Sequence, residues 1–300
     1  MTGRRDGAGP DRTAAETPVV LVAGGTRVDA GKTTFSIGLL AALSARFGDA
    51  VGVKPRAGND YWFDHDDYRL AAGSGRLYGA DARKLAAAST VSLDASGAVT
   101  PESINPLHRL WRPTPGRTGL LGEADRTFLC DRLTTTTGSR FVLNDAAAEA
   151  ELIPAGLRDR LPLADAIRVA DIADLDEITT DRYLPAFDRL ADRVGRADAP
   201  VVVESYGDVA APLDVAFDAV AVVEPGAVRV YAGDRYGRAR AVASGSPREG
   251  RLETHTDAVT AMIDPLSTVP LPALSGEERG DPDRVADRYA PAYEALIGAV

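Results

Sequence analysis

The sequence predicts an α/β fold with a mostly parallel sheet, helices on both faces and a helical insertion. Segment 18–23 is short, β-branched and apolar without alternation, as expected of a strand buried on both faces of a parallel sheet. A helical pattern over 32–47 and a second strand over 50–53 complete a strand–helix–strand unit. Further apolar strands are predicted at 200–203 and 219–223, each after a helical or turn-like segment, which favours parallel pairing.

A long insertion separates the second predicted strand from the third. It runs from about 56 to 199, which is too long for a loop, so it must contain helices of its own. Helical stretches are predicted around 80–89, 157–170 and 181–195, between Pro and Gly breaks. We expect this insertion to determine substrate specificity.

The sequence predicts one domain with an N-terminal tail. Residues 1–17 are predicted to form a flexible tail, and 18–300 a single domain that includes the insertion. Near the C-terminus, 244–251 has the composition of a polar loop and 281–299 the pattern of a closing amphipathic helix.

Composition excludes several classes of function. No apolar run reaches about 18 residues and the N-terminus has no signal-peptide pattern, so we expect a cytoplasmic protein with no membrane partner. The net charge of −10 argues against a nucleic-acid partner, because phosphate backbones are bound by clustered Lys and Arg. Cys130 is the only cysteine, so neither an intramolecular disulfide nor a thiolate metal cluster is predicted.

Lysine is rare in this chain. Only three of its 34 basic residues are lysines, and the others are arginines. Where arginine supplies the general surface charge, a lysine marks a place that needs a compact ammonium group. Two of the three, Lys32 and Lys54, fall within motifs.

Glycines follow the first predicted strand and lead directly into a helix. Such a junction presents backbone N–H groups and the positive end of the helix dipole to an anion. In Gly31-Lys32-Thr33 the lysine can reach the outer phosphates and the hydroxyl can bind Mg²⁺. The alternative, a Gly-rich turn before a helix, gives no reason for the lysine. We therefore predict that ATP is bound by Gly25, Thr26, Asp29, Ala30, Gly31, Lys32, Thr33 and Thr34.

This loop has five residues between Gly25 and Gly31, one more than the usual phosphate loop. The longer form resembles the Gly-Thr-Asp-x-Glu-x-Gly-Lys-Thr loop of the dethiobiotin synthetase family. Four further motifs occur in the family's order, and the resemblance covers mainly 18–110 and 200–213. They are Val53-Lys54-Pro55, the segment Gly79-Ala80-Asp81, Ile104-Asn105-Pro106, and Val203-Glu204-Ser205-Tyr206-Gly207 followed by Pro212.

The resemblance implies a P-loop NTPase-type fold, related also to the ATP domain of cobyrinic acid a,c-diamide synthases. It implies that Lys54 contacts the substrate and the transferring phosphate, that Asp81 helps to hold Mg²⁺, and that Asn105 lies near the substrate. It also implies a homodimer and a place in biotin biosynthesis.

The residues themselves support a metal site formed by Thr33, Asp81 and Glu204. Glu204 ends a buried parallel strand, where open α/β sheets bind ligands, and a buried carboxylate requires a cation. Magnesium on the nucleotide supplies one. The structural alternatives are a strand-end salt bridge for Glu204, a helix N-cap for Asp81 and a solvated strand end for Lys54.

The chain departs from the family's pattern in four places. Gly58 replaces a serine four residues after Lys54, and Asp29 replaces the loop glutamate. An additional segment, 59–68, concentrates acids and aromatics; it is either a lid or second metal contact, or a surface segment that folds its aromatics onto the sheet. The family's adenine-binding part has no counterpart after Val223.

His108 and His255 are isolated and are expected to be structural or exposed.

Two functions are compatible with these features. The first is a Mg-ATP-dependent ligase or cyclase that activates a small carboxylate or carbamate, with Lys32 and Lys54 as catalytic residues. Related amidating enzymes of cobyrinate type add a glutaminase domain with a catalytic cysteine. Glutamine-dependent amidation is not expected here, because Cys130 lies in the insertion and the C-terminal third has no cysteine. The second is a nucleotide-dependent ATPase or regulatory binding module without ligase chemistry. Lys54 favours the first, because a switch has no evident need of a second phosphate-directed lysine.

Overall fold

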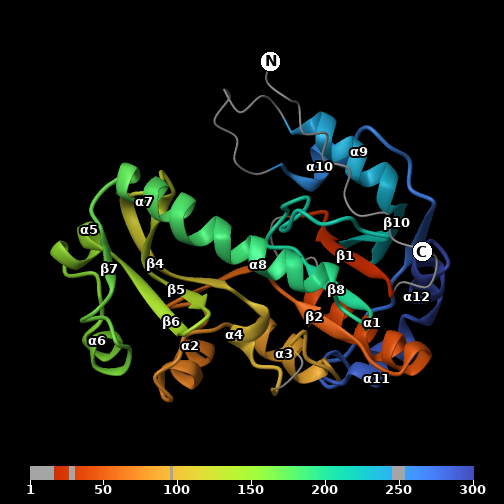
Figure 1. The fold of residues 1–300 in the computed structure, drawn as a ribbon, viewed down its shortest axis with the longest axis horizontal. Helices are drawn as coiled ribbons and strands as arrows, with labels where there is room; N and C mark the ends of the chain where they lie inside the picture. Colours follow the sequence, from red (N-terminus) through yellow and green to blue (C-terminus); the bar gives the residue numbers. More distant parts are fainter. Residues whose placement is uncertain (1–16, 27–30, 95–96, 245–253) are drawn as a thin grey trace.

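Two β-sheets and the helices around them make up the described part of the chain (Figure 1). This computed structural model describes residues 17–26, 31–94, 97–244 and 254–300. The first sheet contains β1 (Val19–Gly24), β2 (Val51–Val53), β8 (Val201–Glu204), β9 (Ala219–Glu224), β10 (Ala227–Ala232) and β11 (Ser267–Pro270). The second contains β3 (Arg56–Asp60), β4 (Leu107–Thr118), β5 (Ala124–Thr135), β6 (Gly138–Asn144) and β7 (Ile167–Val169).

Helices precede, connect and follow these strands. They are α1 (Lys32–Phe47), α2 (His65–Ala72), α3 (Ala80–Ala88), α4 (Pro101–Ile104), α5 (Asp145–Glu149), α6 (Ala155–Arg160), α7 (Ile172–Ile178), α8 (Leu184–Gly195), α9 (Gly233–Ala243), α10 (Thr256–Thr260), α11 (Pro282–Arg288) and α12 (Ala290–Ile297). A π-helical turn at Thr179–Tyr183 joins α7 to α8. None of the described helices is both long enough and apolar enough to cross a membrane.

The first sheet has the strand order β11-β10-β9-β1-β8-β2. Its four strands β9, β1, β8 and β2 are parallel, whereas β10 and β11 form an antiparallel edge. The predicted strands at 18–23, 50–53, 200–203 and 219–223 are these four parallel strands, so the α/β class is confirmed. The antiparallel edge was not predicted.

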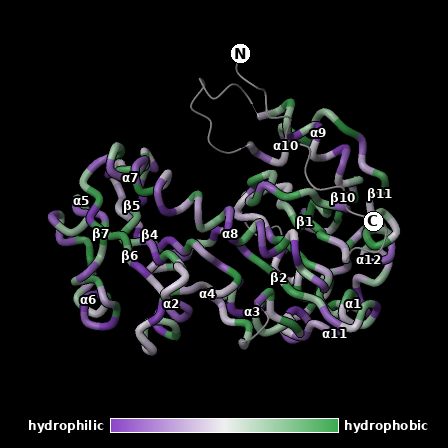
Figure 2. Tube along the Cα trace, viewed as in Figure 1, coloured by the Kyte–Doolittle hydropathy of each residue, from purple (hydrophilic) through white to green (hydrophobic). Residues whose placement is uncertain are grey.

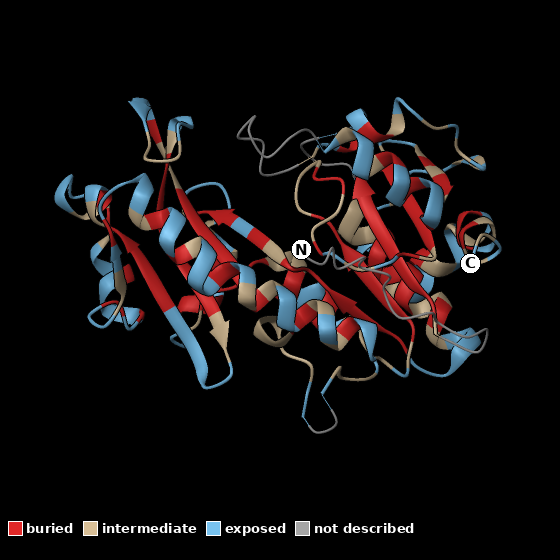
Figure 3. Cartoon of the chain, turned by 45° about the horizontal axis from the view of Figure 1, so that its top comes forward, coloured by how far each residue is buried: buried red, intermediate tan, exposed pale blue. Residues whose placement is uncertain are grey.

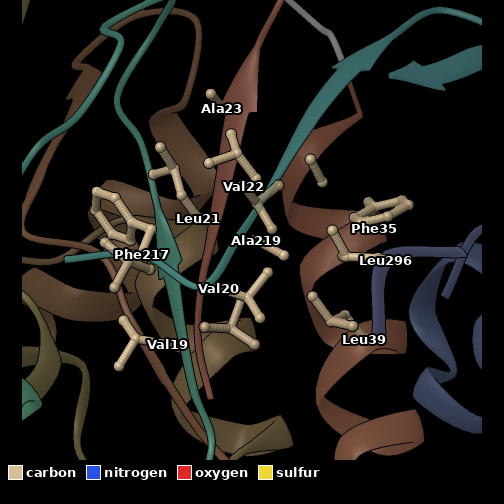
Figure 4. Close-up of a cluster of buried hydrophobic side chains, with 14 of the residues drawn as sticks. Val19, Val20, Leu21, Val22, Ala23, Phe35, Leu39, Phe217, Ala219 and Leu296 are labelled. Atoms are coloured by element: carbon tan, nitrogen blue, oxygen red, sulfur yellow. The ribbon is translucent and has the colours of Figure 1, made fainter. Parts of the chain in front are cut away.

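The core of the first sheet surrounds β1. All six of its residues are buried, which explains why its sequence does not alternate between apolar and polar side chains. Phe35, Leu39 and Leu296 lie on one side of β1 and Phe217 lies on the other (Figure 4). Full burial of each large apolar side chain contributes about 1.5–3 kcal/mol, so contacts on both faces fix this strand at the centre of the sheet.

The second sheet corrects the prediction that the insertion is helical. Its order is β3-β4-β5-β6-β7, with parallel pairs at both ends and antiparallel pairs in the middle. Pro113, Pro115 and Gly116 lie within β4, where its pairing with β5 is irregular. The helix predicted at 157–170 is also wrong, because α6 ends at Arg160 and β7 follows. Pairing with distant strands determines these conformations.

Local patterns predicted several helices correctly. The helices predicted at 32–47 and 80–89 are α1 and α3, and the one at 181–195 comprises the end of the π-helical turn and α8. The single closing helix predicted over 281–299 is instead two helices, α11 and α12. Almost all of the predicted tail and of the polar loop at 244–251 lies outside the described residues.

Helix α8 connects the cores of the two sheets. Ala186 packs in a hydrophobic cluster of the second sheet, Leu190 and Val194 pack in the core of the first, and Phe187 borders both. Figure 1 shows α8 running from one sheet to the other, and Figure 3 shows that it is buried along one side and exposed along the other. Figure 2 shows apolar residues along strands of the first sheet such as β1 and β2, whereas the strands of the second sheet also contain many hydrophilic residues.

Candidate functional site

The predicted phosphate loop lies between β1 and α1. The backbone N–H of Gly25 donates to the Val223 carbonyl at 2.9 Å, so the loop leaves β1 close to the end of β9. Gly31 caps α1 with φ +81°, a left-handed conformation that favours glycine. Thr26 is exposed and Thr34 lies in the first turn of α1. Asp29 and Ala30 lie outside the described residues.

Lys32 bridges from α1 to the segment after β8. Its Nζ donates to the Gly207 carbonyl at 2.8 Å. A Cβ added to Gly24 would lie 2.7 Å from this carbonyl oxygen and 2.8 Å from Lys32 Nζ, so only glycine permits the close approach. Burial lowers the pKa of Lys32, and the nearby charge of Lys54 acts in the same direction. Sequence reasoning missed Gly24, for which the adjacent glycine at 25 was the available signal, and it gave Gly207 only as part of a motif.

Lys54 is buried between two carboxylates. Its Nζ donates to Asp81 Oδ2 at 2.6 Å and to Glu204 Oε1 at 2.5 Å. Burial acts to lower the pKa of Lys54, but the two carboxylates outweigh it and the pKa is raised. The alternative of a solvated strand end is therefore wrong, and three predicted residues from separate motifs meet at one ammonium group.

Glu204 occupies the centre of the site. It is fully buried, and its Oε1 accepts hydrogen bonds from Thr33 Oγ1 at 2.8 Å and from Lys54. Its Oε2 is buried and has no hydrogen-bond partner among the described residues. An unsatisfied buried carboxylate oxygen is costly, and a divalent cation is one of the partners that satisfy it. The strand-end salt bridge exists, but it accounts for only one of the two oxygens.

Asp81 completes the carboxylate pair. It lies in the first turn of α3, whose N-cap is Gly79, so the N-cap alternative for Asp81 is wrong. Burial acts to raise its pKa, yet the charge and the hydrogen bond of Lys54 outweigh burial and lower the pKa to about 2. The carboxylate therefore stays ionised, with its side chain 46% exposed.

The donor set fits Mg²⁺ held together with a nucleotide. The described residues contain no group of three or more His, Cys, Asp or Glu that could hold a metal. Glu204 nevertheless accepts from the Thr33 hydroxyl, and Glu204 and Asp81 both contact the Lys54 ammonium group. Protein-bound Mg²⁺ commonly takes one or two carboxylates and completes its shell with phosphate oxygens and water. Thr33, Asp81 and Glu204 are thus suited to a metal that arrives with phosphate.

Asn105 holds the backbone of Lys54. Its Nδ2 donates to the carbonyl oxygens of Lys54 at 2.7 Å and Leu107 at 2.9 Å, while its Oδ1 accepts from Arg132 Nη2 at 2.6 Å. Its side-chain contacts are therefore structural. Sequence reasoning missed Arg132, although a charged pair, Asp131-Arg132, directly after the apolar run at 128–130 is an unusual feature.

Packing of the second sheet accounts for the glycine at position 58. Gly58 pairs with Arg109 across β3 and β4. A Cβ at position 58 would lie 2.9 Å from the Arg109 carbonyl oxygen, so a serine would force the strands apart. The packing of β3 against β4 therefore favours glycine at this position.

The additional segment 59–68 is only partly folded onto the protein. Tyr61 and Tyr68 pack edge to face with ring centroids 4.9 Å apart. In contrast, Trp62 and Phe63 are 68% and 74% exposed, so the prediction that the aromatics fold onto the sheet is wrong for these two. No second metal group involves this segment among the described residues.

The two isolated histidines are structural or exposed, as predicted. His108 is buried, and its Nε2 lies 2.6 Å from Asn59 Oδ1. Burial lowers the pKa of His108 to about 3, and the charge of Arg132 acts in the same direction. His255 is half exposed, with its Nδ1 3.2 Å from Asp208 Oδ1.

We expect His108 to make folding stability sensitive to acid. The imidazole has a pKa of about 6.5 when unfolded and about 3 when folded, so the unfolded chain takes up the proton first. The contribution of this group to the free energy of unfolding is therefore fully present above the unfolded pKa of about 6.5. It is lost as the pH falls towards the folded pKa of about 3. Between pH 7 and pH 5 this one group removes about 2 kcal/mol from the free energy of unfolding. The free energy of unfolding, measured with urea, should fall between pH 7 and pH 5 by about 2 kcal/mol less in His108→Gln than in the unmodified protein. An equal fall in the two proteins would contradict the assignment.

Comparisons of the chain with protein-family models, with curated proteins and with solved structures found no match. A function can therefore be assigned only from the geometry of the site and from the motifs in the sequence.

Proposed function

We propose that this protein is a P-loop, Mg-ATP-dependent ligase or cyclase of dethiobiotin synthetase type. The observation that supports it most directly is the buried contact of Lys54 with both Asp81 and Glu204, while Glu204 also accepts from Thr33. The four residues come from four separate segments. They meet at the carboxyl ends of adjacent parallel strands, where open α/β sheets bind ligands.

The reaction transfers the γ-phosphoryl group of ATP to a carboxylate or carbamate. The acceptor oxygen forms a bond to the γ-phosphorus, the bond from that phosphorus to the β–γ bridging oxygen breaks, and ADP leaves. An amine then attacks the carbonyl carbon of the mixed anhydride and displaces phosphate, losing a proton. No nucleophilic side chain is required.

The side chains of the site stabilise charge during this transfer. Lys32 and Lys54 place two ammonium groups where negative charge accumulates on the transferring phosphoryl group. Thr33, Asp81 and Glu204 would hold Mg²⁺, which would neutralise charge on the nucleotide oxygens. Glu204 and Asp81 hold Lys54 ionised and oriented, and Thr33 fixes Glu204 by a hydrogen bond at 2.8 Å.

One contact favours the second candidate, a nucleotide-dependent ATPase or regulatory module. Lys32 donates to the Gly207 carbonyl, so the residue predicted to bind phosphate also holds the segment after β8. Phosphate that competes for this ammonium would release the segment, as in a nucleotide-dependent switch. The homodimer and the place in biotin biosynthesis stay predictions from the resemblance.

Phosphate release from Mg-ATP tests the proposal. We expect the release to be stimulated by 7,8-diaminopelargonate with bicarbonate, measured in high salt because the chain is strongly acidic. Turnover that the diamine does not change would favour the ATPase or regulatory candidate, or a different acid substrate. A protein that binds no Mg-ATP would contradict both candidates.

A further inference from the structure

Arg132 places a fully buried charge in the second sheet. It lies on β5, and its side chain is one of the largest in the protein that has no exposed surface. Burial lowers the pKa of Arg132 to about 10, which still leaves the guanidinium group charged at neutral pH. A buried charge is costly unless its hydrogen bonds are satisfied, so packing alone does not account for an arginine at this position.

The three guanidinium nitrogens of Arg132 hold three separate segments. Nε donates to the Leu77 carbonyl oxygen at 2.9 Å, Nη1 donates to Thr134 Oγ1, and Nη2 donates to Asn105, to its carbonyl oxygen at 2.7 Å and its Oδ1 at 2.6 Å. These acceptors lie before α3, at the end of β5 and between α4 and β4. A guanidinium group can join them because its donors are fixed in one plane.

Two of these segments support the ion pair of the candidate site. Asn105 Nδ2 donates to the Lys54 carbonyl oxygen at 2.7 Å, and Leu77 lies four residues before Asp81 in the segment that leads into α3. The orientation of the Asn105 amide is determined by its partners, because a guanidinium group can only donate and a carbonyl oxygen can only accept. Arg132 therefore restrains the backbone on both sides of the contact between Lys54 and Asp81.

We propose that Arg132 is a positioning residue that acts through Asn105 and the segment before α3 to hold the Lys54 ammonium group between Asp81 and Glu204. The catalytic consequence rests on the proposed ATP-dependent function, in which Lys54 must meet the transferring phosphoryl group. Misplacing a reacting group by about 1 Å can lower a rate by about 10²-fold, so loss of this support should lower turnover without removing the lysine.

The rarity of lysine provides a direct measurement of how Lys54 is held. Acetic anhydride acetylates accessible, unprotonated amines. Burial acts to lower the pKa of Lys54, but Asp81 and Glu204 raise it, so the buried ammonium group should react far more slowly than the exposed Lys84. With only three lysines in the chain, mass spectrometry after brief labelling gives the ratio of Lys54 to Lys84 acetylation. This measurement requires neither ATP nor a substrate.

Two variants interrupt the proposed connection at different points. Arg132→Lys keeps the positive charge, but its single ammonium nitrogen cannot replace three nitrogens that reach three segments. Asn105→Asp keeps an acceptor for Arg132 and removes both N–H donations, including the one to the Lys54 carbonyl oxygen. In each variant the acetylation ratio should rise at least about tenfold through local opening. Substrate-stimulated turnover should fall by about 10–10²-fold with ATP affinity unchanged.

Tyr183→Phe provides a matched control on the other face of β5. The Tyr183 hydroxyl donates to Asp131 Oδ2 at 2.7 Å, and this buried bond also belongs to the second sheet. Asp131 is adjacent to Arg132 in the strand, so the two side chains point to opposite faces. The control therefore loses a buried hydrogen bond that does not lead to Lys54, and both its acetylation ratio and its turnover should match those of the unmodified protein.

Thr134→Val keeps the test decisive if Arg132→Lys does not fold. It removes the hydroxyl that accepts from Arg132 Nη1 and leaves the arginine and Asn105 in place. Because only one of the acceptors is lost, the acetylation ratio should rise by a smaller factor, about threefold. Thermal midpoints of all variants, measured under the labelling conditions, show that each protein is folded when it is acetylated.

The results separate the positioning role from the function on which it rests. An unchanged acetylation ratio in folded Arg132→Lys, or in Thr134→Val if the former does not fold, would overturn the positioning role and leave the ATP-dependent function standing. An equal rise in Tyr183→Phe would also overturn it. If the ratio rises only in the variants of the connection, but the unmodified protein releases no phosphate from Mg-ATP, Arg132 does position Lys54 and the proposed function is wrong.

Discussion

Lys54→Ala is expected to lower substrate-stimulated phosphate release by about 10²–10³-fold while leaving ATP binding largely intact. The ammonium of Lys54 is held 2.6 Å from Asp81 and 2.5 Å from Glu204, so its loss removes charge stabilisation near the transferring phosphoryl group. Lys32→Ala should instead abolish nucleotide binding, because this residue begins the helix at the phosphate loop. Separate measurements of ATP affinity and turnover will distinguish the two roles.

Lys84→Ala provides a matched control for both variants. Lys84 is the third lysine of the chain and lies exposed on α3, three residues after Asp81. Its removal should change neither ATP affinity nor turnover appreciably. Removing Lys54 also leaves the buried Glu204 without its cation, so the thermal midpoint of each variant must be measured to separate loss of charge stabilisation from loss of folding. Equal loss of ATP affinity in Lys32→Ala and Lys54→Ala would contradict the separate roles.

The largest effect on stability is expected for Gly233→Ala. Gly233 is the first residue of α9, and an added Cβ would lie 1.7 Å from the Phe217 carbonyl oxygen. Such an overlap cannot be relieved by a side-chain movement, because the atom belongs to the backbone before β9. We expect the free energy of unfolding to fall by about 3 kcal/mol or more.

Gly237 in the same helix serves as the control for this prediction. A Cβ at Gly237 meets nothing within 4 Å. Since alanine favours a helix interior over glycine, Gly237→Ala should raise stability by about 0.5–1 kcal/mol. Urea unfolding of the two variants measures both effects, and a Gly233→Ala protein as stable as Gly237→Ala would show that the backbone contact at Phe217 is wrong.

Local patterns in the sequence predicted the strands of the first sheet because these strands are buried on both faces. A strand such as β1 then has an unbroken apolar run that is visible without knowledge of its neighbours. The strands β4 and β5 lack this signal. They contain prolines, glycine and charged residues, and their conformation depends on pairing with each other and with β3 and β6.

The residues of the candidate site were predictable from motifs, whereas the contacts between them were not. Lys54, Asp81 and Glu204 each belong to a recognisable motif, but their meeting depends on the sheet order, which places β8 between β1 and β2. The contact of Lys32 with the Gly207 carbonyl involves a backbone atom, which no residue pattern reveals. The site residues Asp29 and Ala30 stay predictions, because the structure does not describe them.

The position of α8 has a consequence for how this protein unfolds. The helix supplies Ala186 to the core of the second sheet and Leu190 and Val194 to the core of the first, so neither core is complete without it. If α8 separates from either sheet, apolar surface is exposed on that sheet and on the helix itself. Because the same helix completes both cores, loss of its contacts with one sheet also weakens its contacts with the other. We therefore expect the two sheets to unfold as one cooperative unit.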